Sequence, residues 1–204
     1  THVAPLEYEN LAEGLMIASE VPTSASIRIS GPRALQVNLS PSDISLSIDL
    51  QGLSAGMTSF KRFEESLNIP SGLKITRISP SYVDVKLERV RDRDVPVRVI
   101  LAGVPAPGFL VKSFKPVPEK ITISGAESEL KGVSEVVTEG IDLSNVQESF
   151  SQVVAISYIG NYTDLKEAKT VEVQVVLQPD PDYVPPQPAE EPTEETATEG
   201  EVIK

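Results

Sequence analysis

The chain has 204 residues and no cysteine, and its 30 acidic and 18 basic side chains give a formal net charge of −12. The lack of cysteine excludes disulfides, thiolate metal sites and thiol nucleophiles. The acidic balance argues against nucleic acid and anionic lipid as partners, because both are bound by neutralising phosphates with Lys and Arg. Residues 179–204 contain eight acidic residues and one lysine, so this segment alone carries −7 of the charge.

Two parts of the chain contain the same ordered set of short motifs. The motifs are 3–6 (VAPL), 14–17 (GLMI), 27–31 (IRISG), 48–50 (IDL) and 83–87 (VDVKL), and their counterparts are 94–97 (DVPV), 108–111 (GFLV), 121–125 (ITISG), 141–143 (IDL) and 171–175 (VEVQV). The offsets between them are 91, 94, 94, 93 and 88 residues. Five matches in the same order indicate an internal repeat. We therefore predict two tandem domains, residues 1–90 and 91–178, followed by a tail of residues 179–204.

The hydrophobic period within each copy is two. Residues 44–50 and 83–88 in the first copy, and 171–177 in the second, alternate apolar with mostly polar side chains. Such alternation is typical of strands with one face on a core and the other in water. Residues 126–131, which are followed by Gly132, are the best helical candidate. The predicted fold class is all-β, with at most a short helical turn in each domain.

The connector between the copies, residues 89–94 (RVRDRD), contains no Gly, Pro or Ser. It is therefore not typical of a flexible tether, and we expect a rod-like tandem with limited bending. The alternation of Asp92 and Asp94 with Arg91 and Arg93 indicates a solvated strand. In contrast, residues 179–204 are rich in Pro, Glu, Thr and Ala and cannot bury enough apolar surface to offset the entropy of ordering, so this tail is predicted to be disordered.

Candidate catalytic groups are scarce. The single histidine, His2, lies at the start of the sequence, and no phosphate-binding glycine motif is present. Asp49 and Asp142 recur at equivalent places, and a hydrolase using them is the weakest hypothesis. A residue kept in both copies of a repeat is usually architectural, so we predict that Asp49 and Asp142, like Gly31 and Gly125, form structural turns. No catalytic, cofactor-binding or metal-binding residue is predicted.

The best candidate for a surface that contacts a partner is the loop of residues 103–109 (GVPAPGF). Its prolines and glycines favour an extended turn that could present apolar side chains. The alternative is an ordinary strand connection, because isolated exposed apolar residues are common. The candidate contact residues are Val104, Pro105, Pro107 and Phe109.

Taken in order, these motifs resemble those of the YbbR domain family over residues 3–178. The resemblance rests on four features found in both copies: the opening strand (Val3, Pro5, Leu6; Val95, Pro96, Val97), the Gly14-Leu15 and Gly108-Phe109 pairs, the IxIxG stretches and the repeated Ile-Asp-Leu. In addition, residues 80–85 (PSYVDV) close the first copy in the manner of the family. The resemblance implies small β-rich modules placed in series outside the bacterial cytoplasmic membrane, usually behind one N-terminal membrane helix, and without enzymatic activity.

Since family members include the regulator of a membrane diadenylate cyclase, the resemblance implies a tethered protein-interaction module that modulates cyclic di-AMP synthesis through a protein partner. The expected location is the extracytoplasmic face of the bacterial cytoplasmic membrane. The sequence contains no membrane helix of its own, so contact with the membrane is expected only through an anchor outside it. The alternative is a cell-envelope scaffold or wall-binding spacer. The sequence leaves the oligomeric state open.

Overall fold

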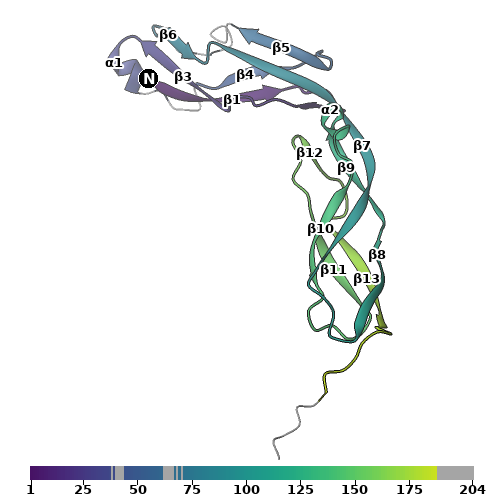
Figure 1. The fold of residues 1–204 in the computed structure, drawn as a ribbon. Coiled ribbons are helices and arrows are strands. Elements are labelled where there is room, and N and C mark those ends of the chain that lie inside the picture. Colours follow the sequence, from purple (N-terminus) through teal and green to yellow (C-terminus); the bar gives the residue numbers. More distant parts are fainter. Residues whose placement is uncertain (38, 40–43, 62–66, 68, 70, 188–204) are drawn as a thin grey trace, which may run out of the picture.

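The computed structural model describes residues 1–37, 39, 44–61, 67, 69 and 71–187. Two elongated β domains follow one another along the chain, and each contains one short helix (Figure 1). The elements of the first domain are β1 (His2–Glu9), β2 (Leu15–Ile17), β3 (Ser24–Ser30), α1 (Arg33–Val37), β4 (Leu46–Asp49), β5 (Gly56–Lys61) and β6 (Lys74–Ser79). Those of the second are β8 (Phe109–Val117), β9 (Lys120–Ala126), α2 (Glu127–Leu130), β10 (Val136–Asp142), β11 (Phe150–Ser157), β12 (Thr163–Leu165) and β13 (Thr170–Pro179). The remaining strand, β7 (Tyr82–Ala102), belongs to both domains.

The first domain is a sandwich of two sheets. One sheet has the strand order β4-β1-β3-β6, in which only the β1–β4 pair is parallel. The other consists of β2 and β5 on either side of the first half of β7. The inward faces carry the alternating apolar residues, such as Ile27, Leu46 and Val85, which are at most 2 % exposed. Alternation of buried and exposed side chains is therefore the physical basis of this domain.

The second domain contains the same strands joined into one sheet of order β12-β9-β7-β10-β11-β13-β8. The sheet is continuous because β10 pairs with β11 at Val137–Ser157 and Thr138–Ile156. Its core is a separate cluster of buried residues from Val95 to Val175, whereas the first core runs from Ala4 to Leu87. The all-β fold and the tandem repeat predicted from the sequence are confirmed.

The strand register corrects one of the motif alignments. His2 pairs with Ile27 in the first domain, and Val95 pairs with Ile121 in the second. Since Ile27 and Ile121 are equivalent, His2 corresponds to Val95, and the offset in this strand is 93 rather than 91. Pro5 and Pro96 are therefore not equivalent. The matched prolines misled the alignment, whereas the inward-facing residues Ala4 and Val97 give the correct register.

The predicted helix at residues 126–131 is confirmed as α2, which Ala126 and Lys131 flank. Its counterpart α1 was not located from the sequence. Among the described residues, no helix is long and apolar enough to cross a membrane.

Both domains end in the same way. In the first, the Val90 N–H donates to Gly14 O at 2.8 Å as β7 leaves the sheet, and in the second the Asp180 N–H donates to Gly108 O at 2.9 Å. The segment predicted as a tail from residue 179 thus begins inside β13, and Tyr183 still lies against Gly108. Residues 188–204, the greater part of that predicted tail, lie outside the described residues.

The connector is part of β7, whose 21 residues run through both domains without interruption. Figure 1 shows the domains meeting at an angle, so the molecule is a bent rod. Limited mobility at this bend stays a prediction.

Candidate functional site: the joint between the domains

The joint is built from the middle of β7 and the elements of the second domain that pack against it. Antiparallel pairing with β9 runs from Val90–Ala126 to Pro96–Lys120, so the connector residues are held in a ladder. Immediately before them, β7 pairs with β2 of the first domain, from Leu87–Ile17 to Arg89–Leu15. No residue between the two ladders is left free of sheet pairing, which gives the joint the character of a strand rather than a linker.

Glu88 links the end of the first domain to the start of α2. Its Oε1 and Oε2 accept hydrogen bonds from Ser128 Oγ at 2.6 and 2.7 Å, and Oε2 lies 3.4 Å from the Ser128 N–H. Lys86 Nζ is 2.8 Å from Glu88 Oε1, and the Glu88 side chain is only 12 % exposed. The hydrogen bond from Lys86, followed by that from Ser128, lowers the pKa of Glu88. The carboxylate in turn raises the pKa of Lys86, so both groups are held in their charged forms.

Arg93 contacts the other end of α2. Its Nη1 donates to Leu130 O at 2.7 Å and to Lys131 O at 3.3 Å. These are carbonyl groups at the helix C-terminus, which lack partners inside the helix. Glu88 and Arg93 thus fix both ends of α2 to the same strand, five residues apart on β7.

Asp92 and Asp94 also have specific partners in the second domain. Asp92 forms an ion pair with Lys166, which lowers the pKa of Asp92 and raises that of Lys166. Thr122 Oγ1 donates to Asp94 Oδ1 at 2.7 Å. All four side chains of this alternating stretch are exposed, as expected for a solvated connector, and Asp92, Arg93 and Asp94 also bind residues of the second domain. One sequence does not show which distant residues a charged strand will meet.

A groove of about 630 Å³ lies beside the joint. Its apolar lining comes from Met16 on β2, from Val90 on β7, and from the β11–β12 loop, which contributes Tyr158, Ile159 and Tyr162. Ile159 is fully exposed at the rim. Mostly apolar concavities at domain boundaries are common binding places, and this groove is a candidate for one.

Tyr162 adopts a backbone conformation that favours glycine, and the equivalent residue of the first domain is a glycine. Tyr162 has φ of 52°, and the equivalent position in the first copy is Gly72, with φ of 105°. A non-glycine residue in the left-handed region is strained. The side chain lines the groove beside the joint. Sequence reasoning missed this residue, and the available signal was a bulky side chain where the other repeat has glycine.

Asp49 and Asp142 each close a tight turn after a strand. Asp49 Oδ1 accepts from the Gln51 N–H at 2.9 Å and from Asn10 Nδ2 at 2.9 Å. Asp142 Oδ1 accepts from the Ser144 N–H at 2.9 Å. Side-chain bonding to the backbone two residues further on is the geometry of an Asx turn. The pKa of Asp49 is lowered by its hydrogen bonds with Asn10 and Gln51, and that of Asp142 by its hydrogen bonds with the side chain and N–H of Ser144.

Gly31 and Gly125 sit where another strand passes too close for a side chain. A Cβ on Gly31 would lie 2.7 Å from Leu73 Cδ2 and 2.8 Å from Gly72 O. A Cβ on Gly125 would lie 2.6 Å from Thr163 Cα and would also collide with Tyr162 O. Both positions require space for the chain segment that leads into β6 or β12.

The candidate partner loop lies at the end of the second domain away from the joint. Val104 is 76 % exposed, and Pro107 is also exposed, whereas Pro105 and Phe109 are half-buried. The Ala106 N–H donates to Val146 O at 3.0 Å and the Phe109 N–H to Ala106 O at 3.1 Å, so the loop is fixed at its centre. The structure does not bring this loop together with the Asp49 turn.

His2 is the first residue of β1. No cluster of His, Asp or Glu residues suited to a metal ion occurs in the part of the chain that the structure describes.

The family model described as "YbbR-like protein" matches residues 3–87 and again residues 95–190. The chain belongs to the YbbR-like protein family. The two matches cover both β domains, and the interval between them is the connector in β7. Membership in this family supports a non-catalytic domain.

Among solved structures, the chain is similar to a YbbR-like protein from Streptococcus pneumoniae, at 13 % identity and a TM-score of 0.45, over 88 % of this chain and 98 % of that one. A second similar structure is a protein from Streptococcus thermophilus, at 20 % identity and a TM-score of 0.38, over 48 % of this chain and 94 % of that one. No curated protein matches the chain.

Proposed function

We propose that this YbbR-like protein is a non-catalytic interaction module on the extracytoplasmic face of the bacterial cytoplasmic membrane, where it modulates a membrane diadenylate cyclase. The observation that carries the proposal is the match of both domains to the YbbR-like family. The residues that recur in the two copies, Asp49 with Asp142 and Gly31 with Gly125, make turns and strand contacts. What the repeat keeps is therefore architecture, and specific activity has to come from the surface.

We also propose that the joint is stiff, because β7 runs through both domains and is paired along its whole central part, and a stiff connection would transmit position. A partner that holds one domain also fixes the other through β7, α2 and the contacts of Glu88 and Arg93. Such a molecule can present the loop of residues 103–109 at a set distance and angle from an anchored end.

The test uses the full-length, membrane-anchored protein co-expressed with the cyclase of the same cell. Cyclic di-AMP is quantified with and without residues 3–178, and co-purification of the two proteins is measured in parallel. A change in cyclic di-AMP in either direction, together with co-purification, supports regulation of the cyclase. An unchanged level without co-purification refutes it.

The loop is tested in the same system by Val104→Asp, with Val153→Asp as the matched control. Both valines are strongly exposed, at 76 % and 66 %, and Val153 lies on β11 outside the loop. If the loop contacts the partner, Val104→Asp weakens co-purification and Val153→Asp does not. Equal effects of the two variants contradict a role for this loop.

The continuous β7 strand also favours a second function, that of an envelope scaffold or wall-binding spacer that spans a fixed distance. Binding to peptidoglycan in a pelleting assay, with no effect on the cyclase, would support this alternative.

A further inference from the structure

The free end of the first domain carries a group of basic residues, three of which have no basic counterpart in the second domain. The group consists of Arg28 on β3, Lys61 at the end of β5, and Lys74 and Arg77 on β6, and we call it the basic edge. All four side chains are exposed. None of the four is in an ion pair with another described residue.

The repeat shows that the basic edge is not architectural. Ser30 pairs with Lys74 in the first domain, and its equivalent Ser124 pairs with Asp164 in the second, so the charge is reversed. By the same comparison, Arg28 corresponds to Thr122. Lys61 pairs with Tyr82 on β7, and Ala155 pairs with Thr170, the equivalent of Tyr82, on β13. Ala155 is therefore the counterpart of Lys61. The second domain therefore forms without positive charge at three of the four positions, while Lys166 lies next to Thr122, the counterpart of Arg28.

Two of the cations face each other at a cost to stability. Arg28 and Arg77 are directly opposite in the antiparallel β3–β6 pair. Like charges at such a position destabilise a sheet. In a chain with a net charge of −12, this arrangement indicates that the positive charge serves to bind an anionic group.

The shape of the basic edge fits an extended chain. β6 is the last strand of its sheet in the described structure, so one side of its backbone is open for pairing. A groove of about 700 Å³ follows this strand, lined by the cations Lys61 and Arg77 and by the hydroxyl groups of Thr76, Ser79, Ser81 and Tyr82. No carboxylate is among its described lining residues. An open strand edge with cations beside it suits an acidic segment that adds as a further strand.

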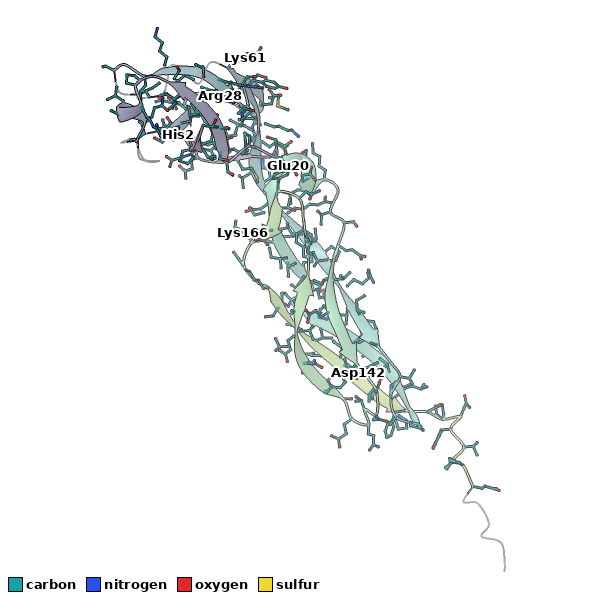
Figure 2. The ribbon with its side chains drawn as sticks, turned by 90° about the vertical axis from the view of Figure 1, so that its left-hand side faces the viewer. His2, Glu20, Arg28, Lys61, Asp142 and Lys166 are labelled. Carbon is teal, nitrogen blue, oxygen red and sulfur yellow. The ribbon has the colours of Figure 1, made fainter. Side chains whose placement is uncertain are left out.

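The opposite end of the molecule is acidic. Asp142, Glu148, Asp180 and Asp182 lie at the far end of the second domain, and the sequence of residues 188–204 contains six glutamates and one lysine. Figure 2 shows Arg28 and Lys61 at one end of the molecule and Asp142 at the other. The two ends of the chain are therefore complementary in charge.

We propose that the basic edge binds the acidic C-terminal segment of a second copy of this chain, extended alongside β6, so that copies associate head to tail. A single copy is poorly suited to bind its own segment. The 21 residues of β7 separate the two ends, a path of about 70 Å at roughly 3.3 Å per residue. The segment would have to run back fully stretched along that path. Binding between copies needs no such extension, and a heterologous contact of this kind builds open chains.

The test mixes two variants that are each unable to form chains. One variant, Lys61→Glu with Arg77→Glu, keeps the acidic segment, and the other lacks residues 188–204 but keeps the basic edge. Sedimentation velocity at about 50 mM salt is expected to show that each variant alone is monomeric, that the unmodified chain associates with rising concentration, and that the mixture forms a one-to-one complex. Raising the salt to about 300 mM is expected to weaken the mixed complex by about tenfold, because surface charges are then screened.

The matched control, Lys112→Glu with Lys169→Glu, makes the same change in net charge at exposed positions of the second domain and is expected to leave association intact. A monomeric mixture overturns the proposal and leaves the cations with the role of keeping β6 from pairing with other strands. Association that the basic-edge variant does not disrupt also overturns it, as does a contact that is independent of concentration and therefore lies within one chain. The readout does not involve a cyclase, so its result is separate from that of the proposed function.

Discussion

Replacing Glu88 by Ala removes the acceptor that connects β7 to α2 across the joint. Ser128 Oγ loses both carboxylate oxygens, at 2.6 and 2.7 Å, and Lys86 loses the partner at 2.8 Å. The backbone ladder of β7 with β9 is unaffected. We therefore expect both domains to fold while the joint becomes weaker and more mobile.

The magnitude follows from the burial of the acceptor. Hydrogen bonds to a charged group contribute about 1.5–3 kcal/mol when they are well shielded from water. The Glu88 side chain is 12 % exposed, but Lys86 beside it is 39 % exposed, so solvent reaches the cluster. Discounting for this screening gives a coupling energy between Glu88 and Ser128 of about 1 kcal/mol.

The assay is a double-mutant cycle with Glu88→Ala, Ser128→Ala and the double variant, measured by urea unfolding. Alanine is compatible with the helix at residue 128, because Ala34 occupies the equivalent place in α1. Small-angle scattering on the same proteins is expected to show a broader distribution of distances for Glu88→Ala than for the control Glu172→Ala, an exposed carboxylate on β13. A coupling energy near zero together with unchanged scattering would refute the role assigned to Glu88.

Three further outcomes are expected. Gly125→Ala should lower the free energy of unfolding by about 2–4 kcal/mol, because its Cβ would lie 2.6 Å from Thr163 Cα. In the control Gly140→Ala the nearest neighbour of the Cβ would be 3.8 Å away, so the loss should be less than about 1 kcal/mol. Equal losses in a calorimetric scan would contradict this account. The pKa of the Asp142 carboxyl is lower in the folded protein than in the unfolded chain, where it is near 4. Its contribution to stability is therefore complete above the unfolded value and is lost as pH falls through the lower folded value. Asp142→Asn should make the free energy of unfolding depend less on pH in this acidic range, and an unchanged dependence would argue against the turn bonds. Ile123→Ala, at a fully buried position of the second core, should cost about 3 kcal/mol in urea unfolding, and a cost below about 1 kcal/mol would show that this core is loosely packed.

Much of this protein could be predicted from its sequence, because the relevant signals are local. Strict alternation of apolar and polar residues, as in residues 83–87, follows directly from the geometry of a half-buried strand. The short helix at residues 127–130 was located from neighbouring positions, and the turn residues Asp49 and Asp142 from their recurrence at equivalent places in the two copies. The repeat was visible because each copy needs the same inward-facing residues to form its own core.

The tertiary structure decided the contacts between residues far apart in the chain. The pairing of Glu88 with Ser128 spans 40 positions and that of Asp92 with Lys166 spans 74, and no local pattern indicates either. The register of β1 was obscured because similar prolines can occur on non-equivalent positions, whereas the packed core admits a single alignment. The basic edge emerged only when strand pairing placed Arg28 opposite Arg77 and Lys61 near the end of β6. Local chemistry sets which residues face inward, and only the folding of distant strands against one another determines which charged side chains meet.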